Sequence, residues 1–203
     1  MKKFLAVAAL TIPSIAFAVP ITFDLRDPAI ESIDEVNSFP LTQGGVTATL
    51  TALPQTFNEP PLRTLVLNQT SSSFGINVVN TTCGGLEDSA LLDGGCTAES
   101  VGIVFNHNVV LNSFKVSSFG GTDQGLITIG ATTIDVLTTG THSLGNVLLG
   151  AGNPWSIGWV AGGGFSFDAF TVTAAAEPRM LALIGAILVA GALLRGRRTS
   201  AVR

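Results

Sequence analysis

Hydrophobic and polar residues alternate in short runs through the middle of the chain, and this period of two predicts β-strands. The clearest run places Val46, Ala48, Leu50 and Ala52 on one face, with three threonines between them. Further strands are expected at 19–26, 62–68, 74–79, 99–106, 109–119, 126–130, 132–137, 144–149, 155–161 and 165–173. Short strands separated by Gly and Asn are typical of an antiparallel sandwich or barrel, so we expect an all-β fold.

Two places depart from simple alternation. The acidic stretch 27–40, bounded by Pro28 and Pro40, is expected to form a loop with one helical turn. In the last strand, Phe165 and Phe167 share a parity that Phe170 does not. This change predicts a β-bulge near Ala169 or a strand buried on both faces.

Both termini carry hydrophobic segments of a different kind. Residues 1–3 are basic, residues 4–15 are apolar, and Ala16-Phe17-Ala18 fits a cleavage site, so 1–18 is interpreted as a signal peptide. Near the other end, residues 180–194 are fifteen uncharged residues. As a helix they would be about 22 Å long, against a membrane hydrocarbon core of about 30 Å. A basic cluster at 195–203 follows and should stay cytoplasmic; its core is Arg195, Arg197 and Arg198.

The charge between these segments is strongly acidic. The whole chain has a formal charge of −4, but most of its basic residues lie in the two terminal segments. Residues 19–178 contain all fourteen acidic residues but only three basic ones, Arg26, Arg63 and Lys115. The formal charge of this part is therefore −11. Such a body repels nucleic acid, whose binding depends on cationic contacts with phosphates. We therefore expect no nucleic-acid partner.

The tail at 174–203 resembles the PEP-CTERM sorting signal of exported bacterial proteins. Its three parts are a motif read here as Ala176-Glu177-Pro178, the hydrophobic helix 180–194 and the arginines behind it. Ala176 stands where that signal has its first proline. The resemblance implies processing by an exosortase-type transpeptidase in the membrane and export in a bacterium that makes exopolysaccharide. The alternative interpretation of the same residues is a plain C-terminal membrane anchor.

Residues 74–173 resemble the jelly-roll domain that is common ahead of PEP-CTERM tails. The resemblance rests on the runs 74–77, 99–105, 109–119 and 165–172, with an acidic glycine-rich loop after the first. It implies that 19–173 is one jelly-roll-like β-sandwich, flanked by an N-terminal signal helix and the C-terminal helix. Such domains are similar in shape to carbohydrate-binding modules and have no settled activity of their own.

Cys83 and Cys96 are the only cysteines of the chain. Two cysteines in one loop of an exported protein predict a disulfide, because that compartment is oxidising. The bond would close a loop of about 14 residues and stabilise the fold by about 3 kcal/mol on a chain-entropy estimate.

The carboxylates are the main candidates for a bound ion. Jelly-roll binding modules often join their first and last strands through a structural calcium, so the resemblance implies a site at Asp24 and Asp168. The alternative is a solvated acidic surface. A pair of glycosidase carboxylates could also lie among the fourteen acids, but the sequence does not single one out.

Trp155 and Trp159 lie four residues apart, which places both on one face of a strand. Two indoles on one face could stack on a sugar ring. Ile157 lies between them on that face and favours burial in the core instead.

The sequence thus predicts an exported, non-enzymatic protein of the cell surface or extracellular matrix. It would pass the Sec translocon and signal peptidase, be held for a time at the inner membrane and reach an exopolysaccharide layer or biofilm. We find no nucleophile with a base to activate it. The alternatives are a carbohydrate-binding module, with or without structural calcium, and a glycan hydrolase.

Overall fold

The computed structural model describes residues 19–27, 34–54, 64–70, 72–79, 91–94 and 97–175. These residues form thirteen strands and confirm the all-β prediction. The strands are β1 (Pro20–Asp24), β2 (Asp34–Val36), β3 (Ser38–Gln43), β4 (Val46–Pro54), β5 (Thr64–Gln69), β6 (Phe74–Val79), β7 (Glu99–Phe105), β8 (Val109–Ser117), β9 (Gln124–Ile129), β10 (Thr132–Val136), β11 (Gly140–Leu149), β12 (Trp155–Ala161) and β13 (Ser166–Ala174).

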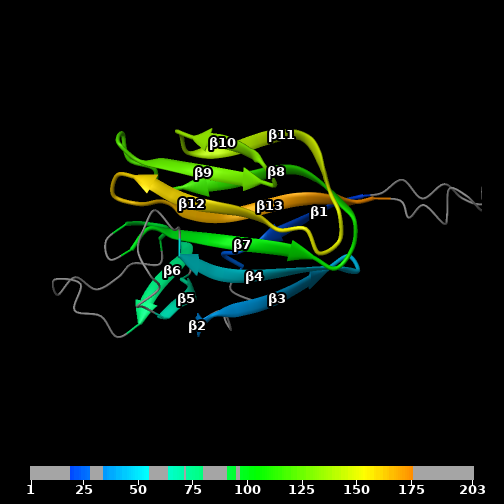
Figure 1. The fold of residues 1–203 in the computed structure, drawn as a ribbon, viewed down its shortest axis with the longest axis horizontal. Helices are drawn as coiled ribbons and strands as arrows, with labels where there is room; N and C mark the ends of the chain where they lie inside the picture. Colours follow the sequence, from blue (N-terminus) through cyan, green and yellow to red (C-terminus); the bar gives the residue numbers. More distant parts are fainter. Residues whose placement is uncertain are drawn as a thin grey trace, which may run out of the picture.

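Two antiparallel sheets pack face to face as a sandwich (Figure 1). The larger sheet has the order β10-β9-β12-β7-β4-β3, and the smaller has the order β1-β13-β8-β11. A third sheet, β2-β5-β6, lies at one end of the sandwich (Figure 1). The sequence does not predict this third sheet as a separate unit. The flanking helices expected at 1–18 and 180–194 lie outside the described residues.

Alternation within the strands builds the core. In β4 the residues Val46, Ala48, Leu50 and Ala52 are buried, while the threonines between them are half-buried on the outer face. A pleated strand sends successive side chains to opposite faces, so this pattern fixes which face meets the other sheet.

Aromatic rings from both sheets meet at the centre of this core. Phe23 of β1 stacks on Phe170 of β13 with ring centroids 4.8 Å apart. Trp155 of β12 meets Phe167 and Phe170 edge-on, with centroids 6.0 and 5.8 Å away. Edge-to-face and offset pairs at these separations add to the burial of the rings themselves.

The prediction of a loop at 27–40 is wrong for the second half of that stretch, because β2 and the start of β3 lie within it. Pro40 is a β3 residue paired with Thr49 of β4. A proline removes a ladder donor, which is tolerated where the strand is at the edge of its sheet. β3 is the edge strand of the larger sheet, and this explains why the proline does not end it.

The bulge expected near Ala169 is confirmed. Phe167 pairs with Val116 of β8, and the next pair is Ala169 with Lys115, so Asp168 is the extra residue on β13. The shift explains how Phe167 and Phe170 can both be fully buried although they differ in parity.

The two ends of the described body lie together. Pro20, the first residue of β1, pairs with Thr173 near the end of β13. Figure 1 shows the start of β1 and the end of β13 at one end of the sandwich. Within the described ranges there is no helix that is long and apolar enough to span a membrane.

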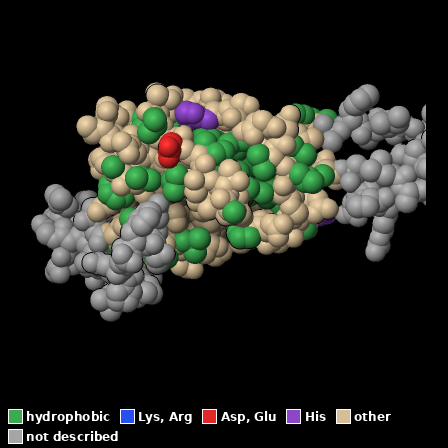
Figure 2. Space-filling model, turned by 45° about the horizontal axis from the view of Figure 1, so that its top comes forward, with side chains coloured by type: hydrophobic (Ala, Val, Ile, Leu, Met, Phe, Trp, Pro, Cys, Tyr) green, Lys and Arg blue, Asp and Glu red, His purple; other side chains and the backbone are tan. Residues whose placement is uncertain are grey.

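Charged side chains are sparse on the face drawn in Figure 2, where hardly any red or blue is seen among hydrophobic and uncharged polar groups. The described residues contain two cationic side chains other than histidine, Arg26 and Lys115.

Candidate functional site

Buried polar side chains gather at one end of the sandwich, which we call the loop end. It is the end at which β1, β4, β8 and β12 finish and β7, β9 and β13 begin. All the buried polar or charged side chains of the described residues come from strand ends here: Glu99, Ser100, Asp123, Ser166 and Asp168. It is opposite the end where Pro20 and Thr173 meet, so it is the natural place to look for chemistry.

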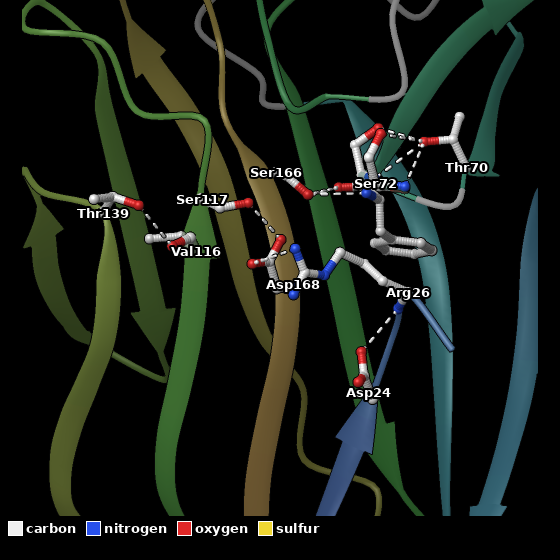
Figure 3. A network of polar contacts seen from close by, with 11 residues as sticks. Asp24, Arg26, Thr70, Ser72, Val116, Ser117, Thr139, Ser166 and Asp168 are labelled. Atoms are coloured by element: carbon white, nitrogen blue, oxygen red, sulfur yellow. Dashed lines mark hydrogen bonds and ion pairs between the residues drawn. The ribbon is translucent and has the colours of Figure 1, made fainter. Parts of the chain in front are cut away.

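Asp168 is the centre of one polar group at this end (Figure 3). Its side chain is fully buried, and its Oδ2 lies 3.3 Å from Nη1 of Arg26, whose side chain is 29% exposed. The hydroxyl of Ser117 donates to Oδ1 at 2.8 Å. The N–H of Leu25 also donates to the Asp168 carbonyl at 2.8 Å. The bulge residue thus joins β1, β13 and β8.

The predicted calcium pair is divided between two environments. Asp24 is exposed, and its Oδ1 accepts the backbone N–H of Arg26 at 3.0 Å. The carboxylate of Asp168 meets the Arg26 guanidinium, as Figure 3 shows. Calcium needs six to eight oxygen ligands and would have to displace this cation. In this arrangement the two carboxylates do not form a shared calcium site, and we derive no role for calcium here.

Asp123 holds a turn that the sequence analysis did not single out. Its side chain is 7% exposed and accepts the N–H of Gly120 and, at 2.7 Å, the N–H of Gly163. Gly162 has a φ of +92°, and a Cβ there would lie 2.2 Å from Asp123 Oδ1. The sequence shows glycines at both turns that Asp123 contacts. Their spacing does not show that one carboxylate connects the two turns.

The carboxylate of Glu99 makes a further contact at the loop end, with the backbone of Asp93. Glu99 is fully buried at the start of β7, and its Oε2 accepts the backbone N–H of Asp93 at 3.1 Å. Leu92, the residue before, exchanges two backbone hydrogen bonds with Phe165, at 2.8 and 3.0 Å. The segment 91–94 is therefore fixed both to the start of β7 and to the chain just before β13.

The two tryptophans differ in environment. Trp155 is 1% exposed in the aromatic core, which confirms the burial interpretation for this residue and removes its ring from any ligand. Trp159 is half-buried, and its Nε1 donates to the carbonyl of Gly162 at 3.2 Å. Its ring lies against Gly94, where a Cβ would be 2.3 Å from Cη2. Stacking on a sugar by both rings together does not fit this arrangement.

The other predicted site residues are not among those described. Cys83 and Cys96 of the expected disulfide, Glu177 and Pro178 of the sorting motif, and the arginines at 195, 197 and 198 all lie outside the described ranges. Within those ranges no group of three or more His, Cys, Asp or Glu side chains is placed to hold a metal ion.

The contacts of the loop end are with the chain itself. The carboxylates of Asp123 and Asp168 accept from backbone amides, a hydroxyl and a guanidinium that belong to neighbouring strands and turns. Buried carboxylates are costly unless they are paired in this way. The arrangement therefore supports a role in fixing the turns and the bulge relative to the two sheets.

Comparison with known proteins gives one distant structural likeness. The chain is similar to the crystal structure of a GH26-CBM35 β-(1,4)-mannanase from Podospora anserina, with 13% identity and a TM-score of 0.36. The match covers 78% of this chain and 28% of the mannanase structure, so the chain corresponds to less than a third of that protein. No family model and no curated protein matches the sequence. The description of the fold as a β-sandwich rests on the strands themselves.

Proposed function

We propose that this chain is an exported, non-enzymatic display protein of a bacterial surface or extracellular matrix. A leader at 1–18 would direct it to the Sec translocon and signal peptidase. A PEP-CTERM-like tail at 174–203 would hold it at the inner membrane until an exosortase-type transpeptidase releases it toward an exopolysaccharide layer. The sequence patterns at the two termini support this route.

The structural observation that supports display is the pairing of Pro20 with Thr173. Because β1 and β13 are antiparallel neighbours, both terminal segments join the sandwich at the same end. A body attached in this way stands on one end and presents the loop end and both sheet faces. We propose a jelly-roll connection of the strands as the finer description of the fold.

The route is tested by following the full chain, with an epitope tag in the body, through cell fractions of an exosortase-encoding bacterium. We expect the double variant Glu177→Ala/Pro178→Ala to keep its tail and accumulate in the inner membrane. The chain offers a matched control in Glu59→Ala/Pro60→Ala, which removes the same dipeptide from the body. Release of both variants alike, or an intact unprocessed chain in the cytosol, would overturn the proposal.

A second candidate function is binding of carbohydrate by the displayed sandwich. The observation that favours it is the surface of the larger sheet, whose outward positions carry hydroxyl and alkyl groups and almost no charge. Affinity electrophoresis tests this function by comparing the mobility of the full chain in plain agarose with its mobility in agarose that contains a soluble polysaccharide. Equal mobility in the presence and absence of every polysaccharide tried would exclude carbohydrate binding.

A further inference from the structure

The outer face of the larger sheet carries a row of aligned positions that crosses all six strands, and five of these positions hold a hydroxyl group. Leu50, Ile103 and Ile157 are fully buried, so the positions that alternate with them face away from the other sheet. The strand register aligns six of these outward positions side by side. We call them the hydroxyl row: Ser38, Thr51, Gly102, Ser156, Thr128 and Thr133.

The row is long enough for a polymer. Neighbouring strands lie about 4.8 Å apart, so six strands set the two outer positions of the row about 24 Å apart. Ser38 and Thr133 at the two edges are exposed, and the side chains at Thr51, Ser156 and Thr128 are half-buried by their neighbours. A ligand that follows the row would thus meet a hydroxyl on every strand except β7, where Gly102 lies.

Apolar groups lie next to this row. The adjacent outward row contains Leu53 and Leu126, and Leu53 is 38% exposed. A Cβ added to Gly102 would lie only 2.5 Å from Cδ1 of Leu53. The leucine side chain therefore covers the glycine and extends into the hydroxyl row. Val160, at the end of β12, is 37% exposed. The face therefore mixes hydroxyl and alkyl groups.

Charge on this face is nearly absent. Among the outward positions of the described strands of the larger sheet, the one charged residue is Asp135, on the edge strand β10. The smaller sheet differs, because exposed Lys115 and Asp24 lie on its strands β8 and β1. A polyanion or an anionic membrane surface would find no cation among the described strands of the larger sheet. The charge distribution fits a neutral partner.

We propose that the hydroxyl row binds a neutral polysaccharide chain lying across the strands. A sugar ring has hydroxyl groups on its edge and C–H groups on its faces, and the face offers hydroxyls with alkyl groups beside them. The ligand class is uncharged glycan rather than uronate or sulfated glycan. This inference rests on carbohydrate binding, the second candidate function, and names its site and its ligand class.

The test uses the full chain in mild detergent and measures its affinity for xyloglucan, mixed-linkage β-glucan and dextran as neutral probes and alginate as the anionic probe. The row variant Thr128→Ala/Ser156→Ala removes a cross-strand pair of hydroxyls from the row. The matched control Thr22→Ala/Thr171→Ala removes a cross-strand pair from the outer face of the smaller sheet, where the two hydroxyls lie 2.9 Å apart. Thermal unfolding checks that each variant is folded.

We expect the wild-type chain to bind at least one neutral probe and not alginate. Two lost hydrogen bonds of ordinary strength should weaken that binding about tenfold or more in the row variant, while the control stays within about twofold. If the row variant unfolds, Thr128→Val removes one hydroxyl at nearly constant shape and should still weaken binding at least about twofold.

Several outcomes would overturn the inference. They are absence of binding to any neutral probe, preference for alginate, and equal affinity of the row variant and the control. Loss of binding in Trp159→Ala with the row variant unaffected would place the site at the loop end instead. A change in oligomeric mass of the row variant without a change in glycan affinity would assign the face to a second copy of the chain. Correct export with any of these results would leave the display function standing.

Discussion

The ion pair between Arg26 and Asp168 gives the sharpest stability prediction. The Asp168 carboxylate is fully buried, with Arg26 Nη1 at 3.3 Å and the Ser117 hydroxyl at 2.8 Å. Replacing Arg26 by methionine keeps an apolar stem of similar length and removes the charge. The carboxylate would then remain buried with one neutral hydrogen bond and no cation.

The cost follows from what is left behind. Removing one partner of a buried ion pair typically costs about 3–5 kcal/mol, because the other charge stays desolvated. Arg26 is 29% exposed, so water can enter where the guanidinium lay and replace part of the lost interaction. We therefore expect the free energy of unfolding to fall by about 2–3 kcal/mol. For a body of this size the melting temperature should fall by about 4–12 °C.

Urea denaturation of the purified chain measures this loss, with Lys115→Met as the control. Apart from Arg26, Lys115 is the one Lys or Arg among the described residues, and it is exposed on β8. Its replacement should change the free energy of unfolding by less than about 0.5 kcal/mol. The double variant Arg26→Met/Asp168→Asn leaves no buried charge at this pair. It should be more stable than the sum of the two single losses predicts, by at least about 1 kcal/mol. An Arg26→Met variant as stable as the control, or strictly additive losses, would refute the reasoning.

Three further predictions concern packing and the cysteines. Gly75→Ala would place a Cβ 2.2 Å from a backbone carbon of Leu91, so we expect urea denaturation to show a free energy of unfolding lower by at least about 2 kcal/mol. As the control, Gly121→Ala meets nothing within 4 Å and should leave the free energy of unfolding nearly unchanged. Trp155→Ala should cost about 3–5 kcal/mol by the same measurement, because it empties the aromatic core; a loss below about 1 kcal/mol would contradict its burial. Reductant should lower the melting temperature by about 6–12 °C if Cys83 and Cys96 are bonded, and unchanged melting would exclude a stabilising disulfide.

Local alternation made most of the strands predictable. The run from Val46 to Ala52 has one apolar face, and the structure buries that face. The parity change at Phe170 predicted a bulge, because a strand with one buried face can change parity only by adding a residue. Ile157 between the tryptophans correctly indicated the burial of Trp155. In each case the deciding contacts are visible within one strand.

The loop end could not be predicted because its contacts join distant parts of the chain. Asp123 accepts the N–H of Gly163, 40 residues away, and Asp168 meets Arg26, which lies near the other end of the sequence. A carboxylate in a sequence does not reveal whether water, calcium or an arginine will be its partner. The strand β3 was missed for a related reason, since Pro40 indicates a strand break unless the strand is known to be at a sheet edge.

The pairing of the first strand with the last has a consequence for how the protein folds. The hydroxyls of Thr22 and Thr171 meet across a separation of 149 residues. Closing so long a loop is entropically costly, and topologies dominated by such remote pairings fold on the slow side, in about milliseconds to seconds. β1 has no β13 to pair with until almost the whole body has been synthesised. On the export route proposed above, a newly made chain should therefore still be open when it is threaded through a narrow translocation pore, and should close only on the far side.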